Sequence, residues 1–184
     1  MKLKKTPIKD LLILEPKIFM DDRGSFMESW NKNEFEALLS IDYLFVQDNF
    51  SVSKKNVLRG LHYQINRPQG KLVRVVSGEV LDVALDLRIN SKTFGHHYSI
   101  KLSDKNNKQL WIPPGFAHGF YVMSQEAKLS YKTTDYYFPD YERCIIWNDP
   151  ELNINWQLSQ KKPSLSTKDS NGSFFTNASV FEDL

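Results

Sequence analysis

Regular alternation of side chains in the middle of the chain is the feature that most restricts its fold. Within GKLVRVVSGEVLDVALDLR (70–88), four apolar side chains alternate with a second set: Leu81, Val83, Leu85 and Leu87 against Val80, Asp82, Ala84 and Asp86. A period of two is that of a β-strand, whose successive side chains point to opposite faces of a sheet. Because Ser77-Gly78 interrupts the pattern, it predicts two strands joined as a β-hairpin at that dipeptide.

Further segments have strand-like patterns and are separated by short polar or Gly/Pro turns. They span residues 43–52, 57–64, 97–103, 108–113, 118–123 and 128–137. Many short strands at close spacing predict an all-β sandwich or barrel.

One segment, NKNEFEALL (31–39), predicts a helix instead. Asn31 and Glu34 have the spacing of a capping box. The apolar side chains that follow share one face: Phe35, Leu38 and Leu39.

The length of the chain predicts a single domain. At 184 residues it can bury a substantial core, and it has no internal repeat or linker, so we expect one domain over 1–184. The tail STKDSNGSFFTNASVF is polar and contains Gly and Ser, which predicts irregular structure packed over the barrel.

Charge and hydropathy argue against several classes of protein. A net charge of +2, with basic residues scattered, does not favour a nucleic-acid or membrane surface. No apolar stretch approaches the roughly 20 residues of a membrane helix. LLIL (11–14) is too short for a secretory signal, so we expect a cytoplasmic protein. The single cysteine, Cys144, predicts neither an internal disulfide nor a Cys-based metal site.

His62, in VLRGLHYQ (57–64), has three possible interpretations: a core histidine, a metal ligand or a general base. Arg59 argues against the first, because arginine is almost never buried without a partner. In a straight strand, however, positions 59 and 62 face opposite sides of the sheet. Gly60 could supply a bulge that brings them together. The pattern alone leaves the choice open.

The metal interpretation lacks ligands. A metal site in a β-barrel typically uses a His-x-His pair and a nearby carboxylate. Gln64 stands where the second histidine would be, and no carboxylate follows before Glu79. His96 and His97 are adjacent and would face opposite ways, while His118 follows a Pro-Gly turn that could aim it inward. We therefore expect no metal.

The general-base interpretation requires a pocket, and polar residues on strand-like segments could supply one. The candidates are Gln47, Asn49, Arg59, Lys71, His118 and Tyr131. Such side chains are costly inside a barrel unless a ligand satisfies them. Two cations and several donors suit a phosphorylated, polyhydroxylated small molecule.

Taken together, several segments resemble the dTDP-4-dehydrorhamnose 3,5-epimerase family of the cupin superfamily. They are DDRGSFMESW, FVQDNFS, VLRGLHYQ, PQGKLVRVVSGEVLDVALDLR, WIPPGFAHGF, YKTTDYY, WNDPELNINW and LSTKD, over roughly residues 7 to 169. The resemblance implies a cupin-type jelly-roll β-barrel with short peripheral helices, a cofactor-free epimerase, a dTDP-linked 4-keto-6-deoxy sugar as substrate, and a homodimer. Residues 170–184 lie outside it.

The resemblance also implies roles for individual residues. His62 would be the catalytic base and Asp169 its partner carboxylate, with Tyr131 the acid on the opposite face of the sugar and Lys71 near the keto oxygen. Tyr137 would stack on thymine, and the residues of DDRGSFMES would contact the nucleotide, in some relatives across a dimer interface. The full set of implied substrate contacts is Arg23, Phe26, Glu28, Gln47, Asp48, Asn49, Arg59, Lys71, His118, Tyr137, Glu142 and Lys168.

Three rival hypotheses remain from the sequence. The chain could be an epimerase that acts on one centre only, or on a GDP-linked sugar. It could be a non-catalytic nucleotide-sugar-binding protein, although binding alone needs no acid opposite a base. A metal-dependent cupin enzyme is disfavoured by the missing ligands.

Overall fold

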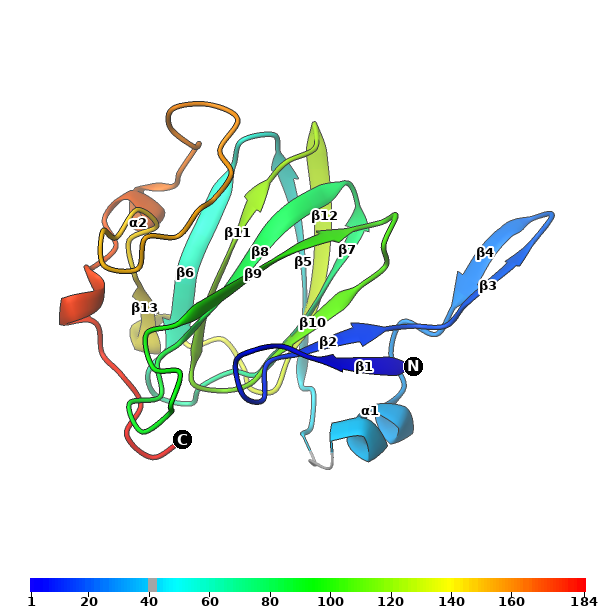
Figure 1. The fold of residues 1–184 in the computed structure, drawn as a ribbon, viewed down its shortest axis with the longest axis horizontal. Helices are drawn as coiled ribbons and strands as arrows, with labels where there is room; N and C mark the ends of the chain where they lie inside the picture. Colours follow the sequence, from blue (N-terminus) through cyan, green and yellow to red (C-terminus); the bar gives the residue numbers. More distant parts are fainter. Residues whose placement is uncertain (40–42) are drawn as a thin grey trace.

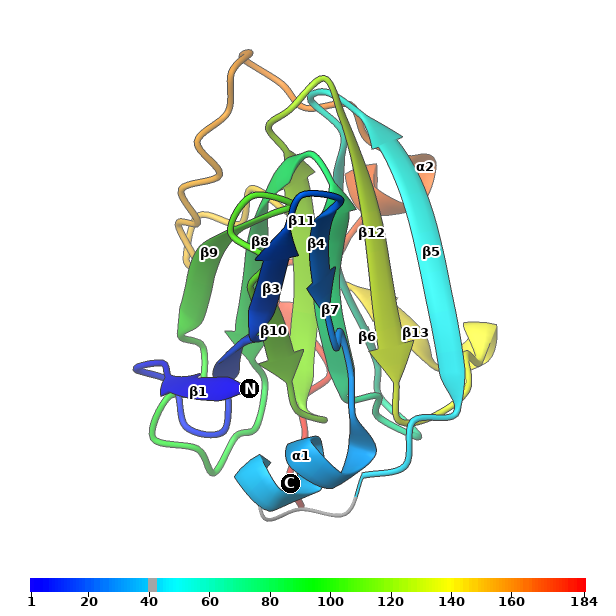
Figure 2. The same ribbon diagram turned by 90° about the vertical axis from the view of Figure 1, so that its right-hand side faces the viewer.

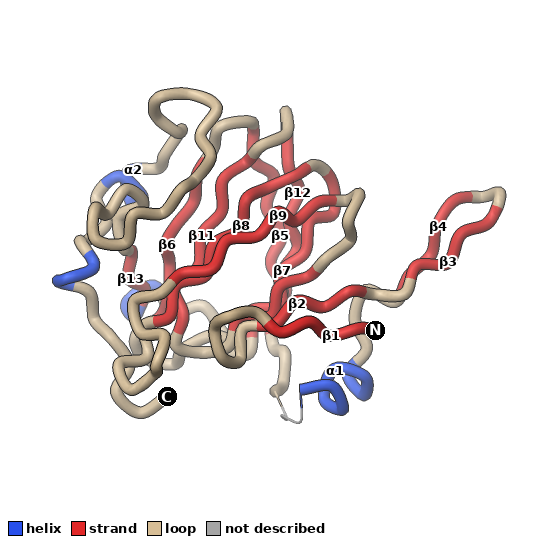
Figure 3. Tube along the Cα trace, in the orientation of Figure 1, coloured by secondary structure: helices blue, strands red, loops and turns tan. Residues whose placement is uncertain are grey.

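Two large antiparallel β-sheets face each other in a computed structural model that describes residues 1–39 and 43–184 (Figures 1 and 3). The six-stranded sheet has the order β1 (Lys2–Lys5), β2 (Leu12–Glu15), β10 (Gln109–Ile112), β7 (Lys71–Ser77), β12 (Glu126–Thr133) and β5 (Gln47–Lys54). The five-stranded sheet has the order β13 (Glu142–Cys144), β6 (Leu58–Gln64), β11 (Phe116–Val122), β8 (Glu79–Asp86) and β9 (His97–Ser103). The predicted all-β class is confirmed.

The main core lies between the sheets. Val73 and Leu129 of the six-stranded sheet and Ala84 and Phe120 of the five-stranded sheet belong to one buried cluster. Each fully buried apolar side chain of medium size contributes roughly 1.5–3 kcal/mol relative to exposure. This core therefore fixes the distance and orientation of the two walls.

The outer face of the five-stranded sheet is covered by the C-terminal segment. Leu81 and Leu85 of β8 pack in a second buried cluster with Trp156 and Phe181. The Phe181 N–H donates to the carbonyl of Leu87 at 3.0 Å, which ties the tail to the barrel. The tail has the expected irregular structure, apart from short helical turns at α2 (Thr167–Ser170) and Phe175–Asn177.

The hairpin predicted at Ser77-Gly78 is wrong. β7 and β8 follow each other directly there, but β7 pairs with β10 and β12, whereas β8 pairs with β11 and β9. Gly78 has a φ of 85° and its N–H donates to the Asp104 carboxylate at 2.8 Å. The chain thus crosses from one sheet to the other at this corner. A period of two identifies a strand but not its hydrogen-bonding partner.

Most other elements lie close to their predicted positions. The segments predicted over 43–52 and 128–137 are displaced, since β5 begins at Gln47 and β12 ends at Thr133. Helix α1 covers Lys32–Leu39, and the Asn31 side chain accepts a hydrogen bond from the Glu34 N–H at 3.3 Å. The Glu34 carboxylate accepts from the N-terminal amine rather than from the Asn31 N–H, so only one of the two hydrogen bonds of the capping box is formed. No helix in the described part of the chain is long and apolar enough to cross a bilayer.

The sequence did not predict the strands at the N-terminal end. β1 and β2 extend the six-stranded sheet, while β3 (Ile18–Asp21) and β4 (Gly24–Met27) form a separate two-stranded arm. The arm projects away from the sheets in Figure 1, and in Figure 2 it points toward the viewer in front of them. It exposes large apolar side chains, among them Met20 at 75% and Phe26 at 67%.

Candidate active site

A cavity of about 310 Å³ lies between the two sheets and is lined by both. Its walls are formed by Gln47, Asn49, Arg59, His62, Tyr63, Gln64, Gln69, Lys71, His118, Gly119, Phe120, Tyr131, Tyr137 and Glu142. Nine of these residues belong to the set that the sequence predicts as catalytic or substrate-binding. The fold therefore gathers residues spread over 96 positions of the sequence (47–142) at one site.

Gly60 explains how Arg59 and His62 reach the same cavity. His118 of β11 pairs with His62, but Phe120, two residues later, pairs with Arg59, so β6 contains one extra residue. This is the bulge that the sequence left open. Gly60 has a φ of 121°, and a Cβ there would lie 2.5 Å from Gly119 Cα, so the position requires glycine. Leu61 then packs in the outer cluster while His62 faces inward.

His62 lies against a buried carboxylate. Its Nε2 is 2.9 Å from Oδ1 of Asp169, whose side chain is 4% exposed. The ring N–H is poorly aligned with that oxygen, so the contact is an ion-pair distance rather than a well-formed hydrogen bond. Catalytic contacts of this kind often tighten only when substrate binds. A carboxylate here can orient the ring and stabilise its protonated form.

Asp169 is held by the short helix on which it lies. Ser166 caps α2, its hydroxyl donates to Asp169 Oδ2 at 2.6 Å, and the Gly60 N–H donates to Oδ1 at 3.0 Å. Burial alone would raise the pKa of this carboxyl, but His62, Ser166 and Gly60 outweigh burial and hold it well below its usual range. Asp169 is therefore ionised at neutral pH.

Lys71 and Tyr131 lie on the opposite wall. Lys71 is 8% exposed and its Nζ donates to the His62 carbonyl at 3.3 Å. Burial lowers the Lys71 pKa to about 8, against the opposing charges of Glu142 and Asp82. Burial also raises the pKa of Tyr131, so its phenol carries a proton at neutral pH. The two side chains come from adjacent strands, β7 and β12.

Glu142 forms the centre of a polar cluster at the rim of the cavity. Its Oε2 accepts hydrogen bonds from the Tyr137 hydroxyl at 2.6 Å and from Lys168. Burial opposes its ionisation, but these two bonds hold its pKa below the usual value. Glu142 Oε1 also lies 3.9 Å from His62 Nδ1. Two of the predicted residues outside the lining, Asp169 and Lys168, thus join the site through His62 and Glu142.

Besides Lys168, four predicted contacts lie outside this cavity. Asp48 occupies the opposite face of β5 from Gln47 and Asn49, and it pairs with Lys132 at 2.9 Å. The others lie on or beside the arm: Arg23, Phe26 and Glu28. In one copy of the chain, these residues do not line the cavity.

The sequence missed the role of Gln64, which it interpreted only as a missing histidine. The Gln64 side chain is buried and donates to the carbonyls of Arg67 and Tyr136, while its Oε1 accepts from the Phe138 N–H at 2.6 Å. It therefore anchors the loop that carries Tyr137. The available signal was its spacing, since Gln64 is two residues after His62 and so points to the same face of the strand.

Three possible metal ligands also approach one another near His62. A ring nitrogen of His62, the Cys144 thiol and an Asp169 oxygen lie within 4.8 Å of one another. Burial raises the Cys144 pKa to about 12, so the thiol keeps its proton at neutral pH. His62 and Asp169 also engage each other. A metal at this donor set would have to displace both the thiol proton and the contact between His62 and Asp169, so the set fits a resident metal poorly.

Comparison with known proteins identifies the family. Residues 5–177 match the family model described as dTDP-4-dehydrorhamnose 3,5-epimerase. An enzyme of that name from Pseudomonas aeruginosa is 54% identical over 98% of this chain and 99% of its own. The crystal structure of a Legionella pneumophila epimerase in complex with dTDP-4-keto-L-rhamnose is 48% identical, with a TM-score of 0.96 over 100% of this chain and 98% of its own.

A protein with a narrower activity has the same fold. The Streptomyces bikiniensis 3'-monoepimerase ChmJ, in complex with dTDP-quinovose, is 31% identical and has a TM-score of 0.87 over 93% of this chain and 86% of its own. Fold alone therefore does not distinguish one inverted centre from two. The family model and the high identity over nearly the whole chain do assign the family: this chain belongs to the dTDP-4-dehydrorhamnose 3,5-epimerases, which are isomerases.

Proposed function

We propose that the cavity inverts carbons 3 and 5 of dTDP-4-dehydro-6-deoxy-D-glucose, giving dTDP-4-dehydro-L-rhamnose, without a cofactor. The observation that carries the proposal is the placement of His62 on one sheet and Tyr131 on the other, both lining one cavity. Inversion needs a base on one face of the sugar and an acid on the other. The facing walls provide that arrangement.

His62 removes the proton. Both carbons are adjacent to the keto group, so proton loss from either gives an enolate. Asp169 orients the His62 ring and stabilises the imidazolium that forms, as the aspartate does in Ser-His-Asp sites. A positioned general base typically contributes about 10²–10⁴ in rate.

Tyr131 and Lys71 complete the reaction on the opposite wall. The phenol of Tyr131 returns a proton to the other face of the sugar, for which its raised pKa keeps it protonated. Lys71, mostly charged below its pKa of about 8, lies where it can stabilise the enolate oxygen. A preorganised donor of this kind is worth roughly 10²–10³ in rate.

Arg59 provides the charge for the diphosphate. Its Nε donates to the Ser53 hydroxyl at 3.0 Å, and within residues 1–39 and 43–184 no carboxylate lies at ion-pair distance from it. A guanidinium without a carboxylate partner suits bidentate binding of phosphate oxygens. We assign the sugar contacts to Gln47, Asn49 and His118, and the nucleoside contact to Tyr137, which is 46% exposed.

Deuterium incorporation tests this function. The protein would be incubated with dTDP-4-dehydro-6-deoxy-D-glucose in heavy water and followed by NMR. Deuterium at carbons 3 and 5 of an inverted product is the expected result. The absence of label at both carbons, with the nucleotide sugar bound, would overturn the proposal and leave a binding protein.

The second candidate is an epimerase of one centre. The similarity to the Streptomyces bikiniensis 3'-monoepimerase favours keeping it. In the same experiment this enzyme would label and invert one carbon while the other kept its proton and its configuration. The ratio of label at the two carbons therefore separates the two candidates.

The arm supports a proposal of a homodimer. Phe19, Met20 and Phe26 are exposed apolar side chains that a second copy of the chain would bury. The same contact would bring Arg23 and Glu28 to the cavity of the second copy, since they do not line the cavity of their own chain. Sedimentation of the wild type and of Phe26→Asp tests this. A dimer that becomes monomeric and loses affinity for dTDP is expected. A monomeric wild type would contradict it.

A further inference from the structure

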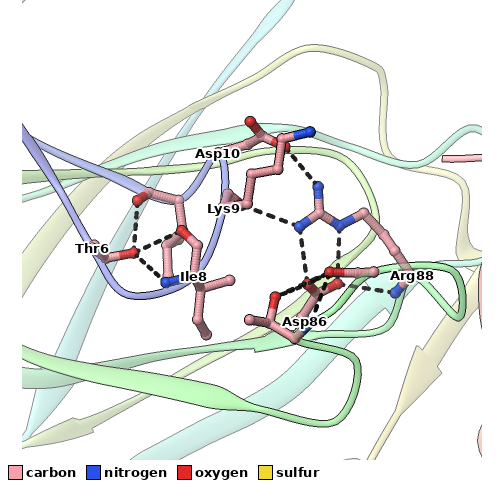
Figure 4. A network of polar contacts seen from close by, with 9 residues as sticks. Thr6, Ile8, Lys9, Asp10, Asp86 and Arg88 are labelled. Atoms are coloured by element: carbon pink, nitrogen blue, oxygen red, sulfur yellow. Dashed lines mark hydrogen bonds and ion pairs between the residues drawn. The ribbon is translucent and has the colours of Figure 1, made fainter.

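Two aspartates on β8 are completely buried and face the space between the sheets, but they are held in different ways. Asp86 binds Arg88 through both oxygens (Figure 4). The hydroxyls of Ser91 and Thr93 also donate to Asp86. Asp82 has both oxygens 3.0 Å from Nε2 of His118. No other hydrogen bond to the Asp82 side chain occurs in the described residues.

This difference gives His118 a defined orientation. A buried carboxylate is costly unless a donor satisfies it, so Asp82 requires a proton on His118 Nε2. In the neutral ring that proton leaves Nδ1 as the acceptor. Across the described chain, Nδ1 makes no hydrogen bond, and the His118 ring lines the cavity while being 8% exposed. Nδ1 is therefore the nitrogen that a ligand meets.

The position of His118 brings this acceptor to the reacting sugar. His118 pairs directly with His62 across β11 and β6, so two histidines, each in contact with an aspartate, face the cavity from adjacent strands. Although burial has the larger effect and lowers the pKa of the Lys71 amine, the residue lies near enough to Asp82 for the negative charge to raise it. The base, the cation and the second histidine thus surround one small volume.

We propose that Asp82 is a positioning residue that keeps His118 in its Nε2–H tautomer, so that Nδ1 accepts a hydrogen bond from a sugar-ring hydroxyl. This inference rests on the proposed function and adds a specificity determinant to it. A ring hydroxyl carries a proton to donate and a keto oxygen does not. Nδ1 therefore selects a hydroxyl at that position, and an analogue lacking it loses the bond.

Asp82→Asn is the central variant, since it keeps the size of the side chain and can donate an N–H to Nε2. The amide thereby favours the opposite tautomer of His118. A lost hydrogen bond of this kind corresponds to about tenfold in binding. We expect KM for the nucleotide sugar to rise about tenfold, because the bond exists in ground and transition states alike, while kcat falls much less, through the smaller effect of the lost charge on Lys71. Affinity for dTDP, which lacks the sugar, should be unchanged.

Two controls separate positioning from a structural role. Asp86→Asn removes the other buried aspartate of the same strand and should lower thermal stability without changing KM. In a His118→Gln background, Asp82→Asn should raise KM no further, because its effect passes through His118. Additive losses, or weaker dTDP binding in Asp82→Asn, would overturn the proposal.

The ring nitrogens of His118 give a readout that does not depend on activity. Nitrogen-15 NMR of the ligand-free protein at neutral pH should show Nε2 protonated and Nδ1 unprotonated in the wild type, with the pattern shifted towards Nδ1–H in Asp82→Asn. A doubly protonated ring, or the same tautomer in both proteins, would refute the inference. A wild type that incorporates no deuterium would refute the proposed function instead, whatever the tautomer.

Discussion

Two groups of charged residues in the same barrel differ in how completely the protein satisfies them. Around Arg88, donors meet acceptors from Asp86, Asp10 and the Lys9 carbonyl, so the network is closed. In the cavity, Lys71 and Arg59 have hydrogen bonds to a carbonyl and a hydroxyl but, among the described residues, no carboxylate at ion-pair distance. An unbalanced charge is costly at a buried position such as that of Lys71 unless a ligand balances it, and the exposed Arg59 stays available to a ligand. The closed network around Arg88 therefore stabilises the fold, and the open group, Lys71 and Arg59, binds the ligand.

The largest effect should follow from removing the general base of the cavity that Lys71 and Arg59 line. For His62→Ala we expect kcat to fall about 10²–10⁴-fold, because no other group takes the proton. Calorimetry should show dTDP binding retained, since His62 is assigned to the sugar. His96→Ala, at an exposed histidine outside the cavity, is the matched control. Retained turnover in His62→Ala would remove the base assignment.

The closed group should respond in stability rather than in activity. Arg88→Met leaves Asp86 buried without its cation, which typically costs about 3–5 kcal/mol of unfolding free energy. Urea unfolding measures this loss, and kcat/KM of the folded fraction should stay at the wild-type value. Lys4→Met, which breaks the exposed pair with Glu15, should change stability little. A loss of kcat/KM in the folded fraction of Arg88→Met would contradict the claim that the Arg88 network affects stability alone.

Lys71 should give the open group a pH dependence that the closed group lacks. Burial lowers its pKa to about 8, so the cation is present below that pH and disappears as pH rises through it. The kcat/KM profile of the free enzyme should therefore fall by about tenfold per pH unit above pH 8. Lys71→Arg, which keeps its charge, should lose this limb. The same limb in that variant would assign it to another group.

Chelation should have the smallest effect. The thiol beside His62 and Asp169 stays protonated, so we expect EDTA to leave turnover unchanged. Loss of activity that a divalent ion restores would revive the metal interpretation.

The sequence predicted strands well and their pairing poorly. Alternation identified β7 and β8, because the two faces of each strand meet different surroundings. The same alternation cannot say that Gly78 turns a corner between sheets, since pairing depends on distant strands. The strands of the arm were not predicted because their apolar side chains are exposed within one chain. They therefore do not show the alternation of buried and exposed positions on which the prediction of strands relied.

The site was predicted residue by residue through resemblance, whereas its geometry needed the fold. In a regular strand, Arg59 and His62 would point to opposite faces of the sheet. The bulge at Gly60 adds one residue between them, so both point to the same face. The alternation of side chains along β5 was enough to predict the position of Asp48. It lies between Gln47 and Asn49 and so faces away from the cavity. Asp82 was visible as an acid among apolar neighbours, but its partner His118 lies 36 residues away.

Tyr131→Phe in heavy water tests the central claim, that base and acid occupy facing walls of one cavity, most directly. His62 should still remove protons and return deuterium to the same face. NMR should therefore show deuterium entering the substrate at carbons 3 and 5 while inversion falls roughly 10²-fold or more. Inversion at the wild-type rate in this variant would contradict the account, because the proton would then reach the second face without Tyr131.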